Sequence, residues 1–311
     1  MTYPKFFDAK NTLKLFELEK DFNFLSSLYT KKVLPKTLLL TGNKGSGKAT
    51  LLSHFLASVF DPNNYDKKKL LISENSIFHK QFKSNVFTNI IYLNGSDHKS
   101  VKIDDIRTLK KEISKSTILG KDRFIVLDDV ELFNNNSLNA LLKAIEEPNE
   151  RDFFFLINNK AKPLLETIKS RALEIKIILN KEQNLNIINN LMDLYNLEII
   201  FDPKIIKLSP GNFIKFNYII KEFDISIEHD LVENLSLLLN LYKKNKDILF
   251  INIIFFIVDL YFKKLINKNI YEINNIYEIK NFIFDHLNKF LLFNINQNAL
   301  INAIDKKLNY E

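Results

Sequence analysis

The sequence contains no cysteine and no tryptophan, and it has only six glycines and seven prolines in 311 residues. The absence of cysteine excludes disulfide bonds and zinc sites with thiolate ligands. The five histidines are scattered, and none of them form a pair at helical metal-ligand spacing. We therefore expect no zinc and no metal site built on histidine.

The sequence also lacks an apolar run long enough to cross a bilayer. Its most apolar stretch, Ile248–Phe262, contains Asn252 and Asp259, and it is shorter than the ~20 residues that a membrane span needs. The first twenty residues are too charged for a signal peptide. We therefore predict a buried helix at this stretch, in a soluble, cytoplasmic protein without a membrane partner.

The charge balance is moderately basic, with 44 lysines and arginines against 37 aspartates and glutamates. This balance is compatible with nucleic acid or an acidic partner, although many basic proteins bind neither. Hydrophobic residues make up 46% of the chain, which is ordinary for a globular protein, and the length allows two or three domains.

A glycine-rich loop carries the clearest chemical signal. Gly42 and Gly47 enclose four residues, including Gly45, and Lys48 follows. This spacing is typical of a phosphate-binding loop, whose backbone N–H groups and lysine hold phosphate oxygens. The next position normally carries a serine or threonine hydroxyl that ligates magnesium, but here it is Ala49. The sequence thus retains the phosphate cradle and lacks one metal ligand.

The segments around the loop have the order that this motif requires. Thr37–Thr41 is predicted to be a strand and Lys48–Phe60 a helix, so the loop connects a strand to a helix. Further strands are predicted at Asn89–Leu93, Phe124–Leu127, Phe153–Ile157 and Leu173–Ile177. Helices are expected between them, which favours an α/β fold with a parallel sheet covered on both faces.

A pair of carboxylates ends the strand at Phe124–Leu127. Asp128 fits the position of the acid that holds magnesium through water. Asp129 stands where many such ATPases place a glutamate that orients the attacking water, and it is one methylene shorter. The alternative is that both residues only form a solvated strand end.

Two strings lie at and just after the end of this strand, Asp128–Phe133 and Ser137–Pro148, with Asn-Ala-Leu-Leu-Lys followed by Glu-Glu-Pro in the second. They resemble the signature of bacterial clamp-loader subunits, a group within the AAA+ ATPases. Ile103–Arg107 resembles the segment that opens the preceding helix in the family. Thr167–Ala172 resembles the family's Ser-Arg-Cys motif, with alanine in place of cysteine. These matches cover roughly residues 37–178.

The resemblance implies an AAA+ nucleotide-binding domain at residues 1–180, a small helical lid at 181–226 and an all-α collar for oligomerisation at 227–311. It implies membership of the clamp-loader complex of bacterial DNA polymerase III, a nucleotidyl-transferring assembly that acts in DNA replication. The partners would be the motor and delta subunits of the loader, the sliding clamp and primed DNA. The apolar segments after residue 227 are also explained by an internal helical core alone.

Within this family the sequence is more similar to the stationary subunit than to the motors. Motor subunits are expected to have serine or threonine at Ala49, glutamate at Asp129, and an arginine where the Ser209–Gly211 turn is followed by Asn212. ATP with magnesium could then still bind, at a site that is vestigial for hydrolysis. The alternatives are an active motor subunit, in which Thr50 replaces the missing hydroxyl, and an interaction module that binds no nucleotide.

Arg171 matches the arginine of the Ser-Arg-Cys motif. In the resemblance this arginine crosses a subunit boundary and neutralises charge on the ATP of a neighbour. The alternative is a local cap or ion pair on the surface.

A second basic feature lies on the helix expected at Asp104–Ser116. Arg107, Lys110 and Lys111 share one helix face because they recur at i, i+3 and i+4. Such a face is a candidate contact for DNA phosphates, which bind independently of sequence and with a strong salt dependence. A solvated basic face explains the same pattern.

Overall fold

A computed structural model gives the fold of the chain in two compact units. The described residues are 3–97, 101–115, 120–205, 207–226, 230–267 and 273–309. The first unit, called the sheet unit here, comprises Tyr3–Leu197 and Leu208–Ile214. The second, called the helical unit, comprises Glu198–Lys207 and Lys215–Glu311. The boundaries predicted at residues 180 and 226 remain predictions.

The sheet unit contains a parallel sheet with the strand order β4-β5-β6-β1-β7. Its strands are β1 (Thr37–Thr41), β4 (Ile90–Asn94), β5 (Arg123–Asp128), β6 (Asp152–Asn158) and β7 (Leu173–Lys176). All five predicted strands are therefore confirmed, with ends that differ by at most one residue. The central strand β1 is buried along its whole length, as expected for an apolar run that pairs on both sides.

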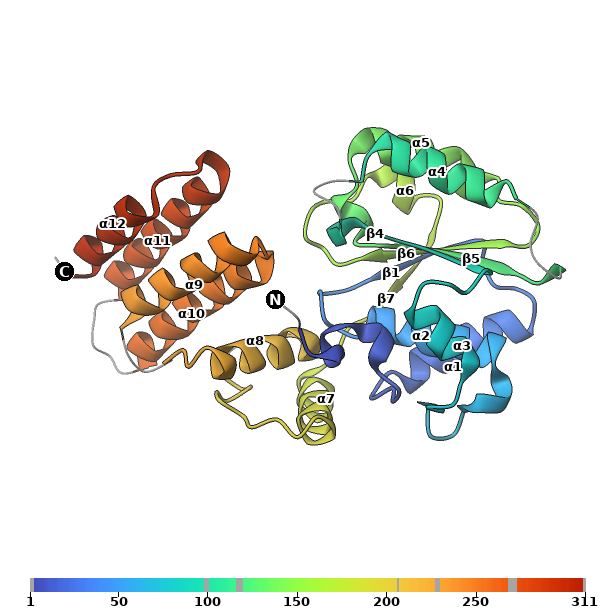
Figure 1. Cartoon of the computed structure of the whole chain (residues 1–311), viewed down its shortest axis with the longest axis horizontal. Helices are drawn as coiled ribbons and strands as arrows, with labels where there is room; N and C mark the ends of the chain where they lie inside the picture. Colours follow the sequence, from blue (N-terminus) through green and yellow to red (C-terminus); the bar gives the residue numbers. More distant parts are fainter. Residues whose placement is uncertain are drawn as a thin grey trace. The chain divides into compact units, whose positions relative to one another are not determined.

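Helices cover both faces of this sheet (Figure 1). One face carries α1 (Glu19–Thr30), α2 (Lys48–Phe60) and α3 (Ile77–Lys83), and the other carries α4 (Ile103–Ile113), α5 (Asn135–Glu146) and α6 (Glu166–Lys169). The apolar side chains of strand β5 alternate between the two faces, so helices must cover both of them. Phe124 and Val126 pack on the α2 side, whereas Ile125 and Leu127 pack on the α4 side. The predicted α/β architecture is confirmed.

Two parts of the sheet unit go beyond the sequence-based expectation. Helix α1 was not predicted, and it contributes Phe22 and Leu25 to the core. The polar composition of the segment 61–83 predicts a surface insertion or hairpin, and the segment contains a two-stranded hairpin of β2 (Tyr65–Asp66) and β3 (Leu71–Ile72), followed by α3. Its aromatic side chains make this insertion part of the core, because Tyr65, Phe78 and Phe82 are buried.

Two further helices follow the sheet in the sequence. Helix α7 (Lys181–Leu194) begins at Asn180, whose side chain forms a reciprocal capping box with Gln183. Helix α8 (Pro210–Glu222) begins three residues before Phe213, where the sequence pattern predicts its first residue. Its first residue is Pro210, which is well suited to the first helical position because its N–H would have no helical partner. The segment Ser209–Gly211 is therefore not a separate turn before a helix, as was expected, but leads directly into α8.

The helical unit is built on four further helices, α9 (Leu231–Asn245), α10 (Ile248–Asn267), α11 (Ile273–Phe293) and α12 (Gln297–Asn309). Helix α9 packs on α10 and α12, and α11 packs on the same two helices. The apolar stretch predicted to be a buried helix lies in α10, where residues such as Phe250 and Ile254 are fully buried. Within the described ranges, no helix is long and apolar enough to cross a membrane.

Candidate functional site

The predicted chemical residues meet at the carboxyl ends of the parallel strands. The glycine loop follows β1, Asp128 ends β5, and Asn158 ends the neighbouring strand β6. Carboxyl ends are where open parallel sheets place ligand sites, because the loops there converge. The fold therefore brings the two halves of the predicted nucleotide site together.

The loop has the backbone conformation that its glycines allow. Gly45 and Gly47 adopt φ angles of +82° and +92°, which disfavour residues with a side chain, and Gly47 caps the start of α2. Lys48 is buried, and its Nζ donates to the carbonyl oxygens of Gly42 and Asn43, each at 2.8 Å. Burial lowers the pKa of Lys48 to about 8, although nearby carboxylates oppose this shift. The lysine thus has acceptors from its own loop.

Asp129 lies at the centre of a closed set of side-chain contacts. Its carboxylate accepts hydrogen bonds from Lys44 Nζ at 2.9 Å, from Asn159 Nδ2 at 2.7 Å and from the hydroxyl of Ser96. Burial favours a higher pKa for Asp129, but Lys44, Ser96 and Asn159 together hold it below its usual value. The carboxylate is therefore ionised, and each of its oxygens accepts at least one hydrogen bond from a protein group.

Asp128 is held by different partners. Tyr92 Oη donates to its Oδ2 at 2.6 Å, and the backbone N–H of Asp129 donates to its Oδ1 at 2.8 Å. Burial raises the pKa of Asp128, while the Tyr92 hydrogen bond opposes this shift. The neighbouring Glu131 is buried and accepts the backbone N–H groups of Asn159 and Ala161, so it fixes the loop that carries Asn159.

The start of α8 lies directly against the glycine loop. The N–H of Gly211 donates to the carbonyl of Gly45 at 2.9 Å, and Ser209 Oγ donates to the carbonyl of Lys44 at 2.5 Å. A β-carbon placed on Gly211 would lie 2.9 Å from Gly45 Cα, and one placed on Gly45 would lie 2.9 Å from Asn212 N. Asn212, the residue expected in place of an arginine, is thus next to the loop and carries no charge.

These contacts test whether magnesium suits the site. Ala49 offers no oxygen, and it packs instead against the hydrophobic core beside the loop. The carboxylates of Asp128 and Asp129 already accept hydrogen bonds from protein donors. The site therefore lacks the hydroxyl ligand of position 49, although Asp128 keeps acceptor sites that suit a magnesium-bound water and the loop backbone still has the form of a phosphate cradle. Among the described residues, no group of three histidines or acidic residues is arranged to hold a metal.

Arg171 is exposed and lies two residues after α6, which ends at Lys169 and is shorter than the helix expected at Pro163–Arg171. Its Nε donates to Oε1 of Glu146, at the end of α5, and its Nη1 donates to the carbonyl of Thr167 at 2.9 Å. The guanidinium is thus held by local partners at the surface, where another molecule can reach it.

The predicted basic face lies on α4. Arg107 and Lys111 are exposed, whereas Lys110 is half-buried. Arg107 forms an ion pair with Asp104 at 2.7 Å, so part of its charge is offset within the helix.

Sequence reasoning missed several residues that shape the site: Lys44, Tyr92, Ser96, Glu131 and Asn159. One signal was available, since Asn158 and Asn159 follow an apolar strand that neighbours the strand of Asp128. Two amide side chains at that edge indicate groups that face the acidic pair. Nothing in the sequence alone indicated that Lys44, inside the loop, would pair with Asp129.

Comparisons with known proteins identify the family to which the chain belongs. Residues 18–180 match the family described as DNA polymerase III, delta subunit, and this match spans just over half of the chain. The chain belongs to this family. A DNA polymerase III subunit delta′ of Buchnera aphidicola is 35% identical over 120 residues, which cover 36% of this chain and 36% of the relative. The delta′ subunit of Pseudomonas aeruginosa is 36% identical over 76 residues, or 24% of this chain and 23% of the relative.

Other relatives carry the name of a different subunit. A Buchnera aphidicola DNA polymerase III subunit gamma is 26% identical over 147 residues, covering 47% of this chain and 39% of that protein. Among solved structures, a gamma subunit-related protein of Thermotoga maritima is 17% identical, with 91% of this chain and 96% of that chain covered and a TM-score of 0.48. The resemblance to clamp-loader subunits is confirmed, and the chain is a delta-prime-like member of them.

Proposed function

We propose that this delta-prime-like chain is a stationary subunit of the clamp loader, which supplies Arg171 to the nucleotide of a neighbouring motor subunit and hydrolyses little or no ATP itself. The loader would open a sliding clamp and close it on primed DNA. Motor and delta subunits of DNA polymerase III would be its immediate partners, and the cytoplasm its location.

The environment of Asp129 is the observation that supports little or no ATP hydrolysis by this chain. A general base must have a lone pair within hydrogen-bond reach of the attacking water. Both Asp129 oxygens are already bonded, one to Asn159 and the other to Lys44 and Ser96. Its low pKa also makes it a weaker base than an ordinary carboxylate. Together with Ala49, this leaves a weakly basic, hydrogen-bonded carboxylate at the position of the base and no hydroxyl ligand for magnesium at position 49.

The exposure of Arg171 supports the proposal that this residue reaches the nucleotide of a neighbouring subunit. An arginine finger needs a guanidinium at the surface, where it can cross to a neighbour, and such fingers increase rates roughly 10³–10⁵-fold in phosphoryl transfer. The ion pair with Glu146 is partly exposed, with side-chain exposures of 35% and 40%. Exposed ion pairs contribute only about 0–1 kcal/mol, so the phosphates of a neighbouring nucleotide can compete for the arginine.

The basic face of α4 is a weaker candidate for DNA contact. Arg107 and Lys111 are accessible, but the pairing of Arg107 with Asp104 reduces its charge. We propose that this face contributes to phosphate binding only in the assembled loader, where several subunits would surround the duplex. Such a contribution would weaken as the salt concentration rises.

Two measurements on the isolated chain test the proposal against an active motor. Phosphate release with ATP and magnesium should be far below ~1 s⁻¹, the lower end of ordinary enzyme turnover. Binding of a fluorescent ATP analogue then separates a vestigial nucleotide site from a loop that binds no nucleotide. Turnover at or above ~1 s⁻¹ would contradict the inert site and favour the motor interpretation, in which Thr50 supplies the missing hydroxyl.

A further inference from the structure

Three carboxylates act electrostatically on the ammonium group of Lys48 in the glycine loop. Burial lowers the pKa of Lys48, and Asp128, Glu131 and Asp129 all oppose this shift. Glu131 is buried, and its Oε2 has no hydrogen-bond partner among the described residues. The phosphates of a nucleotide in the loop would therefore meet an acidic neighbourhood, and like charges at short range repel each other.

In phosphate-loop proteins, magnesium normally offsets this repulsion. The ion bridges phosphate oxygens, and it is held by the hydroxyl after the loop lysine and by the acid at the strand end. Here position 49 is alanine, so the hydroxyl ligand is missing while the acidic neighbourhood is retained. A loop of this kind holds phosphate well only if another positive charge offsets the carboxylates.

Lys44 brings a positive charge to this place. Its Nζ donates to Asp129 Oδ2 at 2.9 Å and to Ser96 Oγ at 3.1 Å. The ammonium group is thus held by a carboxylate and a hydroxyl, which are oxygen donors of the kind that also bind magnesium. Burial favours a higher pKa for Asp129, and Lys44 is the strongest of the groups that lower it instead.

The backbone around Lys44 is fixed by the start of α8. The carbonyl of Lys44 accepts a hydrogen bond from Ser209 Oγ at 2.5 Å, and the carbonyl of Gly45 accepts one from the N–H of Gly211 at 2.9 Å. All these residues, like Asp129, belong to the sheet unit. The side chain of Lys44 is 51% exposed, so its ammonium group faces solvent on the side away from the carboxylate.

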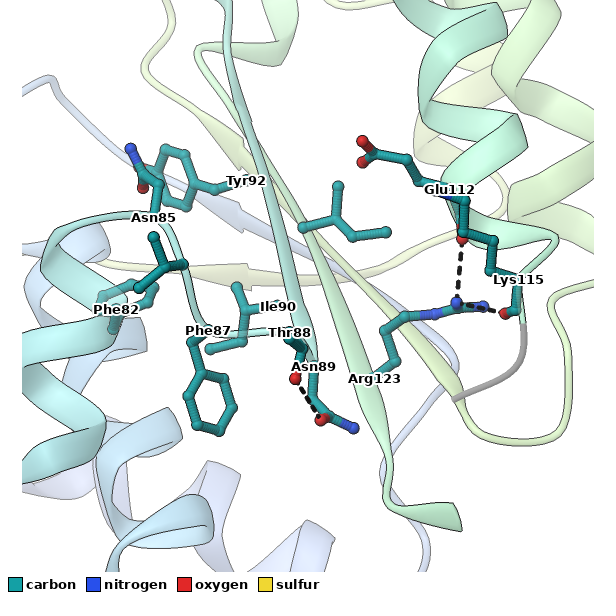
Figure 2. Close-up of a pocket in the computed structure, with 12 residues that line it drawn as sticks. Phe82, Asn85, Phe87, Thr88, Asn89, Ile90, Tyr92, Glu112, Lys115 and Arg123 are labelled. Atoms are coloured by element: carbon teal, nitrogen blue, oxygen red, sulfur yellow. Dashed lines mark hydrogen bonds between the residues drawn. The ribbon is translucent and has the colours of Figure 1, made fainter. Parts of the chain in front are cut away.

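Neutral donors hold the neighbouring Asp128. Tyr92, which Figure 2 shows on strand β4, donates to its Oδ2 at 2.6 Å, and the N–H of Asp129 donates to its Oδ1 at 2.8 Å. Tyr92 also lines a cavity of about 450 Å³ along β4, but neither Lys44 nor Asp129 lines it, so this cavity is separate from the loop. Asp129 is therefore the carboxylate whose charge Lys44 offsets directly.

We propose that Lys44 replaces magnesium as the group that neutralises Asp129, so that the glycine loop holds the phosphate chain of a nucleotide without a metal ion. This role rests on the proposed function, in which the site hydrolyses little or no ATP, and it adds the form of the ligand, a metal-free nucleotide polyphosphate. It does not depend on Arg171. Magnesium can still reach Asp128 through water, but binding does not require it.

The test measures the Kd of a fluorescent ATP analogue for the full chain, once in EDTA and once in magnesium. The ratio of the Kd in EDTA to the Kd in magnesium should be about 1 for the parent chain. In Lys44→Gln the charge of Asp129 is no longer offset, and the ratio should rise roughly tenfold or more, since only magnesium then supplies the missing positive charge. The control is Lys31→Gln. Lys31 is exposed and lies between α1 and β1, towards the amino ends of the strands and away from the loop, so its loss should leave the ratio unchanged.

A double variant, Lys44→Gln with Asp129→Asn, separates neutralisation from a direct contact. It removes the ammonium group and the carboxylate together, so the ratio should return to about 1. A parent chain that binds the analogue only with magnesium, or not at all, would overturn the proposal. An unchanged ratio in Lys44→Gln, or a ratio that stays high in the double variant, would also overturn it. Phosphate release by the parent chain reports separately on the proposed function, because turnover at or above ~1 s⁻¹ contradicts an inert site whatever the ratio of the two Kd values.

Discussion

Arg171 donates a hydrogen bond from its Nε to Oε1 of Glu146, so the proposed trans-acting arginine has an internal partner in the isolated chain. Glu146 lies at the end of α5, in the string that resembles other clamp-loader subunits. The pair keeps the guanidinium near the surface without burying it. Engagement with a neighbouring nucleotide then requires only the exchange of one anionic partner for another.

This relationship predicts that Arg171→Ala barely affects the stability of the chain. An exposed ion pair contributes about 0–1 kcal/mol, so the free energy of unfolding should fall by less than about 1 kcal/mol. Urea denaturation measures this change, with Lys169→Ala as a matched control, since Lys169 forms a similar exposed pair with Glu166. A loss of several kcal/mol would show that Arg171 is a structural residue.

A second prediction concerns restoration of the residues expected in a motor. Asp129→Glu adds a methylene at a residue that is 3% exposed and whose carboxylate accepts hydrogen bonds from three donors. Overpacking of this kind costs about 1–3 kcal/mol, so the variant should be less stable and still inactive. Ala49 is half-buried, so a threonine at this position should be tolerated better. Urea denaturation and phosphate release of both single variants and the double variant test this. Turnover near ~1 s⁻¹ in the double variant would contradict it.

A third prediction concerns the contact between the loop and α8. In a helix, Gly→Ala usually stabilises by about 0.4–1 kcal/mol through the unfolded state. At Gly211 the new β-carbon would lie 2.9 Å from Gly45 Cα and 3.1 Å from its carbonyl oxygen. This contact should reverse the sign of the stability change, so Gly211→Ala should destabilise the chain by about 1–2 kcal/mol.

The control for this variant is Ser209→Ala, which removes the hydrogen bond to Lys44 without adding an atom. It should cost about 1 kcal/mol, the value of a typical hydrogen bond. If Gly211→Ala were more stable than the parent chain in urea denaturation, the contact between α8 and the loop would not exist in solution.

A fourth prediction concerns acid pH and the buried His54. Its ring nitrogens contact the carbonyl of Thr12 and the hydroxyl of Tyr65, each at 3.2 Å, so the neutral ring donates to one and accepts from the other. Burial lowers the pKa of His54 from 6.5 to about 3. The unfolded chain therefore binds a proton below pH 6.5 that the folded chain does not bind, and stability falls as the pH drops from 6.5 towards 3.

The slope of this loss should approach about 1.4 kcal/mol per pH unit for one histidine. Urea denaturation between pH 7.5 and 5 measures it. His54→Gln should reduce the slope, and the remainder reports other groups such as His79, whose pKa burial also lowers. An unchanged slope in His54→Gln would show that His54 is not protected from protonation in the folded chain.

The sequence predicted the sheet well because each strand is a short apolar run that ends in a polar residue. Thr37–Thr41 and Lys48–Phe60 have the predicted ends in the structure, since the loop glycines mark both boundaries. Helix α1 was missed because its stripe of buried residues, which includes Phe22 and Leu25, is interrupted by charged and polar residues. The start of α8 was misplaced because proline and glycine usually indicate a turn, whereas here Pro210 is the first helical residue.

The site was predicted only in part for a physical reason. The positions of the loop, Asp128 and Asp129 follow from local motifs, so the sequence alone located them. The contact of Lys44 with Asp129 and that of Tyr92 with Asp128 join residues far apart in the chain. Such contacts depend on the order of strands in the sheet, which local patterns do not encode.

The most direct test of the account is the ATPase activity of a reconstituted clamp loader that contains the Arg171→Ala chain. Arg171 is proposed to act on the nucleotide of a neighbour, so the complex should assemble normally while its DNA- and clamp-stimulated ATPase falls at that one boundary. The loss should be large, because arginine fingers are worth roughly 10³–10⁵ in rate at the site they serve. The Lys169→Ala complex should retain full activity. An assembled Arg171→Ala complex with unchanged stimulated ATPase would contradict the central claim.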